Sequence, residues 1–260
     1  ASMQHHQPQR SNAPMLRSTE SYESQLSPST MFPHVNPHAR NTPTPRSSFD
    51  LAMSEGPKES ARRDYTDTSL VPEAQSAATE LFTQIQENPH SYDAHVQFIR
   101  LLHAGFMNHV YPPDNPEVHR DPRKYDLLKD MRVAREEMDK LFAMGEVLWA
   151  EWIQDESMLA QTVEERIAVM ELCQRSVEEE YGSTKLWNIY GEWVLYLYNA
   201  ALGDAGQGQW TEEDRLVGRE VFTWQSVLDV WQRGAEATRW RINDSHIVWD
   251  QLLDLRMQEL

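Results

Sequence analysis

The feature that most constrains the fold is a tryptophan-containing pattern that recurs along the second half of the chain. All nine tryptophans lie between Trp149 and Trp249. The run Leu148-Trp149-Ala150-Glu151-Trp152 is echoed 38 residues later by Leu186-Trp187-Asn188-Ile189-Tyr190, and more weakly by Val248-Trp249. Aromatic residues at i and i+3 lie along one flank of a helix. Recurrence at a period between about 20 and 50 residues predicts stacked helical repeats, each of which buries its apolar face against its neighbours.

Composition divides the chain near residue 72. Residues 1–72 contain nine of the 14 prolines, twelve serines and no tryptophan, and their seven basic residues balance seven acidic ones. No apolar run there keeps a helix or strand period, so we expect this segment to be disordered. Residues 73–260 then carry the whole net charge of −17 and form the predicted repeat domain.

Beyond residue 72 the apolar residues follow helical spacing, and no alternating strand pattern occurs, so the predicted class is all-α. Prolines, glycines and N-cap residues mark the helix ends, and Thr162 with Glu165 forms a capping box. The expected helices cover 72–87, 91–107, 122–142, 146–160, 163–181, 184–202, 211–238 and 244–260.

These helices are expected to form an α-solenoid of antiparallel pairs, with about three and a half repeats. The predicted pairs are 91–107 with 122–142, 146–160 with 163–181, and 184–202 with 211–238. The helix 244–260 then has no partner, and its apolar face would be bare. We therefore expect the natural protein to continue beyond Leu260.

Most aromatic residues of the repeat frame are expected to be core side chains packed between helices. This expected core set is Trp149, Trp152, Trp187, Tyr190, Trp193, Trp231 and Trp249. Trp210 and Trp240 fall in predicted connections and fit no repeat position, which makes them the candidate contacts for a partner. The acidic run 178–180 lies at a predicted helix C-terminus, where the helix dipole disfavours acids. It is interpreted either as a solvated helix end or as a contact for a basic partner surface.

No catalytic, cofactor or metal site is expected. Cys173 is the only cysteine, which excludes an internal disulfide, and no paired cysteines or His-Glu-x-x-His motif indicate zinc. The glycine-rich segment 203–208 lacks the preceding strand and following Lys-Ser/Thr of a phosphate-binding loop. No stretch approaches the roughly 18 apolar residues of a membrane span, and no signal peptide opens the chain. A non-enzymatic, intracellular protein without cofactors or a membrane partner is therefore expected.

The charge balance also opposes direct RNA binding, because acidic residues outnumber basic ones two to one in residues 73–260. One basic strip interrupts this pattern, although aspartates are interleaved with it. Its members are Arg120, Arg123, Lys124, Lys129, Arg132 and Arg135. We interpret the strip as a solvated helix face.

The recurring frame resembles the first helix of the half-a-TPR (HAT) repeat, which is found in RNA-processing proteins. Trp187, Tyr190 and Trp193 match that helix fully, whereas Trp249 is followed by Leu252 in place of the second aromatic. Trp149 and Trp152 match with Glu156 displaced by one position. Elements of the second helix are recognisable in residues 134–138 and 230–235.

The runs 87–102, 131–138 and 148–156 are more closely similar to the N-terminal HAT region of the nuclear splicing factors that recycle the U4/U6 snRNP. The resemblance spans about residues 85–260. The insertions 111–122 and 203–210 depart from the pattern of the animal proteins. It implies a nuclear scaffold that binds spliceosomal or other RNA-processing proteins. It also implies RNA-recognition motifs downstream of this chain, and a homodimer formed through later repeats. Two alternatives stay open: a HAT scaffold of pre-mRNA 3′-end cleavage, and a direct RNA-binding module.

Overall fold

The computed structural model describes residues 64–115, 117–203 and 210–258. Over these residues every regular element is a helix, and none is a strand. The all-α prediction is therefore confirmed for this part of the chain. The disorder expected for residues 1–63 concerns a segment that lies outside the described residues.

Most helices begin and end close to the positions expected from their caps, but of the expected helix 122–142 only residues 128–141 are α-helical, after a 3₁₀ turn at 122–124. Pro72 occupies the first turn of its helix, and Thr162 and Thr211 each form a capping box with the residue three positions later. Gly203 ends another helix with φ +90°, a conformation that favours glycine. The elements are α2 (Pro72–Glu87), α3 (Tyr92–Val110), η1 (Pro122–Lys124), α4 (Leu128–Leu141), α5 (Gly145–Leu159), α6 (Val163–Glu179), α7 (Thr184–Leu202), α8 (Glu212–Val221), α9 (Trp224–Thr238) and α10 (His246–Met257).

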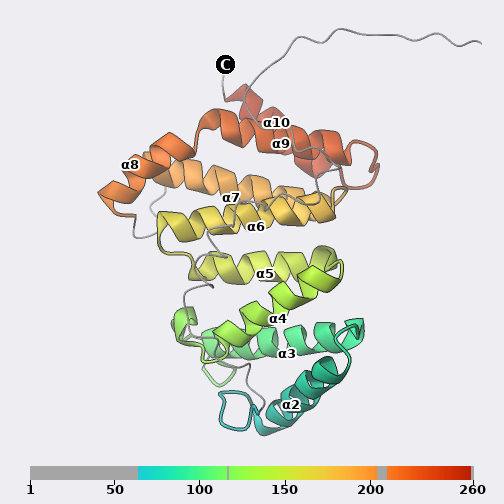
Figure 1. The fold of residues 1–260 in the computed structure, drawn as a ribbon. Coiled ribbons are helices and arrows are strands. Elements are labelled where there is room, and N and C mark those ends of the chain that lie inside the picture. Colours follow the sequence, from blue (N-terminus) through green and yellow to red (C-terminus); the bar gives the residue numbers. More distant parts are fainter. Residues whose placement is uncertain (1–63, 116, 204–209, 259–260) are drawn as a thin grey trace, which may run out of the picture. The chain divides into compact units, whose positions relative to one another are not determined.

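Helices that are neighbours in the chain pack on one another as antiparallel pairs. Contacts join α2 to α3, α3 to α4, α5 to α6, α6 to α7, and α9 to both α7 and α10. The first helices of adjacent repeats also touch, since α7 contacts both α5 and α10. Figure 1 shows α2 to α10 following one another through the stack in chain order. This arrangement is the predicted α-solenoid.

One cluster of buried apolar side chains runs through the stack from Tyr65 to Leu255. A smaller cluster lies beside it and contains Val163, Leu197, Ala200, Ala201, Trp210 and Phe222. Because the large cluster is shared by successive helix pairs, each pair depends on its neighbours for burial of its apolar face.

The packed structure begins before residue 72, which corrects the expected domain boundary. Tyr65 is 1% exposed, and its ring packs edge-on against Phe82 and Phe98 at centroid distances of 6.0 and 5.8 Å. Leu70 is buried as well, against Gly105 of α3. These two side chains anchor residues 64–71 although the surrounding composition is polar.

The helix expected over 211–238 is two helices, α8 and α9, and this is a second correction. The chain is extended at Phe222, with φ −97° and ψ 91°, and Thr223 caps α9 by accepting the backbone N–H of Ser226. Phe222 is buried edge-on against Trp210. The break lets α9 pair with α7 while α8 lies against α6 and α7.

Candidate protein-interaction surface

Most of the repeat-frame aromatics are buried between helices. Trp149 stacks on Trp152 with ring centroids 5.4 Å apart, and Trp187 stacks on Tyr190 at 6.2 Å. These four rings and Trp231 are all buried. Burial raises the pKa of Tyr190 to about 12, as expected for a phenol inside an apolar core. These side chains form the repeat core and offer no surface to a partner.

Trp193 and Trp249 depart from that pattern. Trp193 is only partly buried and donates its indole N–H to the carbonyl of Arg166 at 3.2 Å. Trp249 is 39% exposed, which corrects its expected place in the core. The reason is the register of α10, which packs inward through Val248 and Leu252, while Trp249 lies about 100° further round the helix.

Trp210 is a buried anchor and not the exposed partner contact that was expected. It is 7% exposed, and the guanidinium of Arg166 lies over its ring at 4.3 Å. A Cβ atom added at Gly218 would come within 2.9 Å of the same ring. Trp210 therefore fixes the start of the α8 region against α6, although it lies in a connection.

Trp240, the other candidate contact, is exposed. Its side chain is 66% accessible and lies on Gly182, where an added Cβ would be 2.9 Å from the ring. Tyr181 and Ile242, which neighbour this contact along the chain, are 58% and 95% exposed. We call Tyr181, Trp240 and Ile242 the Trp240 platform. These exposed side chains belong to two connections, α6–α7 and α9–α10, which meet where Trp240 lies on Gly182.

Hydrogen bonds hold these two connections together beneath the platform. Arg241 donates to the carbonyl of Gly182 at 3.2 Å and forms two hydrogen bonds with Asp244, at 2.8 and 2.6 Å. Thr184 donates to the same carboxylate at 2.9 Å. The Arg241 hydrogen bond is the main reason that the pKa of Asp244 lies below its usual value. These bonds fix the two connections relative to each other, so little backbone entropy is lost there when a partner binds the exposed Trp240 ring.

The acidic run 178–180 has a structural role that the sequence alone did not reveal. Glu179 accepts the backbone N–H groups of Met144 and Gly145 at 2.8 and 3.1 Å, and the indole N–H of Trp149 at 2.8 Å. The end of α6 thus satisfies free donors at the start of the antiparallel helix α5. The helical hairpin could have indicated this contact, because it brings these two helix ends together.

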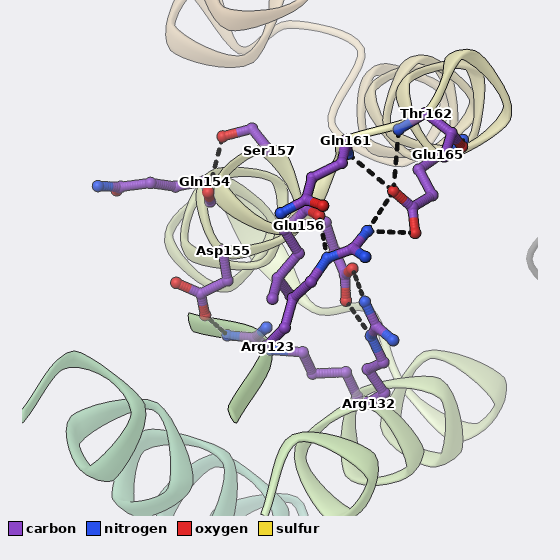
Figure 2. A network of polar contacts seen from close by, with 11 residues as sticks. Arg123, Arg132, Gln154, Asp155, Glu156, Ser157, Gln161, Thr162 and Glu165 are labelled. Carbon is purple, nitrogen blue, oxygen red and sulfur yellow. Dashed lines mark hydrogen bonds and ion pairs between the residues drawn. The ribbon is translucent and has the colours of Figure 1, made fainter. Parts of the chain in front are cut away.

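Several arginines of the predicted basic strip form ion pairs with acidic residues of the repeat stack. Arg132 forms two hydrogen bonds with Glu156, and Arg123 pairs with Glu165, as Figure 2 shows. Partial burial raises the pKa of Glu165, but the backbone donors of Gln161 and Thr162 and the Arg123 guanidinium outweigh it and lower the pKa below its usual value. These arginines join helices and are not presented as a free cationic face.

Arg135, the last residue of the strip, is fully buried. It donates to Asp155 at 2.6 Å, and His103 contacts the same carboxylate oxygen at 2.8 Å. The three side chains come from α3, α4 and α5. They lock three successive helices together with a buried charged group at the centre.

The described residues lack two features, a metal-ligand cluster and a membrane-spanning helix. Within them, no group of three His, Cys, Asp or Glu side chains is arranged to hold a metal ion. None of their helices is both long and apolar enough to cross a bilayer. Cys173 is buried, and burial raises the pKa of its thiol well above the usual value, so it is not an activated nucleophile.

Comparison with known proteins places the chain beside one group of splicing factors. The mouse protein named spliceosome associated factor 3, U4/U6 recycling protein, is 31% identical over 134 residues, which cover 52% of this chain and 11% of the mouse protein. The human protein of that name is 29% identical over 134 residues, and the zebrafish one is 27% identical over 96 residues. No protein-family profile matches the chain. The resemblance to U4/U6 recycling factors is confirmed, and the match spans about a tenth of those relatives.

Proposed function

We propose that this chain is a non-enzymatic scaffold of nuclear pre-mRNA splicing, which binds spliceosomal proteins during U4/U6 snRNP assembly or recycling. The observation that carries the proposal is the similarity to proteins named for U4/U6 recycling, over half of a chain that folds as stacked helix pairs. Stacked helical repeats present long surfaces to partners. The same similarity favours this process over pre-mRNA 3′-end cleavage.

The surface suits a protein partner better than RNA. The Trp240 platform supplies an exposed, fixed aromatic side chain of the kind that dominates binding energy at protein interfaces. The net charge of −17 steers a basic partner toward the chain and repels phosphate. Within this proposal, RNA recognition belongs to motifs downstream of the chain, and dimerisation belongs to later repeats.

The test is affinity capture with the immobilised 260-residue chain in nuclear extract of the source organism, with and without ribonuclease. We expect U4/U6 snRNP proteins to be enriched, and to remain bound after the RNA is digested. Capture of 3′-end-cleavage factors in their place would contradict the proposed process. Loss of every splicing component after digestion, together with tight and salt-sensitive binding of purified RNA, would instead support the RNA-binding alternative.

A further inference from the structure

A groove lies between α5 and α7, the first helices of two adjacent repeats. It has a volume of about 420 Å³ and is lined by residues of those two helices only. On α5 the lining residues Val147, Ala150, Glu151 and Gln154 form one stripe, spaced by three or four positions. The groove therefore follows the helices for several turns and belongs to the repeat stack itself.

Both helices contribute apolar side chains to the walls of the groove. Val147 is 49% exposed, Ile153 is buried at the base, and Ile189 and Trp193 are partly buried on the α7 side. The indole N–H of Trp193 is already bonded to the carbonyl of Arg166, so its ring edge is fixed and its remaining surface is apolar. Aliphatic side chains fit such walls.

The groove also contains charge that its own residues leave uncompensated. Glu151 and Glu192 line it, against the single basic residue Lys185. One carboxylate oxygen of Glu151, Oε2, is buried and has no hydrogen-bond partner among the described residues. Glu192 accepts the side-chain amide of Asn188 at 2.8 Å. The lining thus holds two carboxylates against one ammonium, and this excess negative charge complements a cationic donor from a partner.

We propose that this groove binds a short segment of a partner protein in which an arginine is flanked by aliphatic residues. The guanidinium pairs with Glu151 and Glu192, and the aliphatic side chains contact Val147, Ile189 and Trp193. This inference rests on the proposed scaffold function, for which it names the chemistry of one partner segment. RNA fits the site poorly, because two carboxylates would face its phosphates.

The test is selection of peptides from a displayed library of random sequences on the full 260-residue chain. Peptides that carry arginine beside aliphatic residues are expected to be enriched. Their affinity, measured by fluorescence anisotropy, should fall on the order of tenfold for the double variant Glu151→Gln/Glu192→Gln. The matched control is Asp254→Asn, which removes an exposed acid from α10. It should change the affinity less than about twofold.

A second variant should raise the affinity for the selected peptides, where the double variant lowers it. Lys185→Met removes the positive charge that faces the groove, so the affinity of the selected peptides should rise on the order of threefold. Lys185 is exposed, so this change leaves the core intact. Methyl NMR signals of Ile153 and Ile189 should shift when a selected peptide is added.

The proposal would be overturned if no peptides are enriched, if the enriched peptides contain no basic residue, or if the double variant leaves their affinity unchanged. Shifts confined to methyl groups outside the groove would overturn it too. None of these results depends on splicing. If nuclear extract still yields U4/U6 proteins with the double variant while the peptides fail, the groove proposal falls and the scaffold function stands. If the wild-type chain captures no splicing protein, the scaffold function falls first.

Discussion

Glu179, near the end of α6, accepts the indole N–H of Trp149 at 2.8 Å. The same oxygen accepts two backbone N–H groups at the start of α5. One carboxylate thus caps a helix and orients a core tryptophan at once. This relationship ties the surface of one helix to the core side chain of its antiparallel partner.

Replacing Glu179 with alanine should therefore destabilise the fold, although this residue is exposed. Loss of a helix cap and of a hydrogen bond to a buried indole should cost about 2 kcal/mol in the free energy of unfolding. Urea unfolding followed by circular dichroism measures this change. The matched control is Glu178→Ala, since the neighbouring acid accepts a hydrogen bond from the side chain of Gln174 on its own helix and caps no other helix of the described residues. Equal effects of the two variants would show that the cap has no special role.

The α7–α9 contact depends on two glycines that face tryptophans. A Cβ added at Gly191 would come within 2.3 Å of the Trp231 ring, whereas one added at Gly234 would lie 3.2 Å from Trp187. Gly191→Ala should cost about 1–3 kcal/mol in the free energy of unfolding, because the buried ring must move. Gly234→Ala should be close to neutral, since the gain of about 1 kcal/mol in helix propensity offsets a milder contact. A stable Gly191→Ala variant with an unchanged melting temperature would contradict this packing.

Trp240→Ala separates binding from folding. The side chain is 66% exposed, so its removal should lower the melting temperature by no more than a few degrees. Capture of splicing proteins from nuclear extract should nevertheless fall at least tenfold, because an exposed, fixed aromatic is lost. Leu216→Ala is the control, since it truncates a similarly exposed apolar residue on α8. If the Trp240→Ala variant captures splicing proteins as well as the wild type does, the Trp240 platform is not part of the interface.

The hydrogen bonds that Glu165 accepts from the backbone of Gln161 and Thr162, together with its Arg123 pair, predict a specific acid sensitivity. The pKa of Glu165 is lower in the folded protein than its usual value, so its contribution to stability is present above the unfolded pKa. That contribution is lost as the pH falls through the folded pKa. Between about pH 7 and about pH 3 the wild type should therefore lose more stability than Glu165→Gln. The adjacent exposed acid supplies the control, since Glu164→Gln should leave the pH profile unchanged. Parallel profiles for Glu165→Gln and the wild type would refute the assignment.

The helical pattern of the sequence was sufficient to predict the stack but not the placement of every aromatic. Periodicity predicts which face of a helix is apolar, so the burial of Trp149 and Trp187 follows from spacing and caps. It does not predict where a connection turns back. Trp210 is buried under the guanidinium of Arg166 and edge-on to Phe222, the residue at which α8 ends. Nothing in the helical period of 211–238 indicated that break.

Local patterns also failed for contacts between distant charges. Glu179 lies at a helix end where the dipole disfavours an acid, and only its neighbour α5 explains why it is there. Arg132 and Arg135 are part of an apparently basic strip, yet their partners lie on another helix. Such pairs depend on which helices pack together. Local sequence patterns do not predict that packing.

The buried Arg135–Asp155 pair should be coupled far more strongly than an exposed pair. Both side chains are fully buried, so Asp155→Asn leaves an uncompensated cation and should cost about 3–5 kcal/mol in the free energy of unfolding. Arg135→Met in that background removes the stranded charge, and the double variant should be more stable than Asp155→Asn alone. The control pair is Lys140 with Glu137, whose side chains are 62% and 55% exposed, respectively.

Urea unfolding of the wild type, both single variants and the double variant gives the coupling energy for each pair. The exposed pair should couple by less than about 1 kcal/mol, because water screens it. The buried pair should couple by several times that amount, since both side chains are fully buried and the Arg135 charge is compensated by the Asp155 carboxylate. Additive effects at Arg135 and Asp155 would show that the two groups stabilise the stack independently, and that the link from α4 to α5 lies elsewhere.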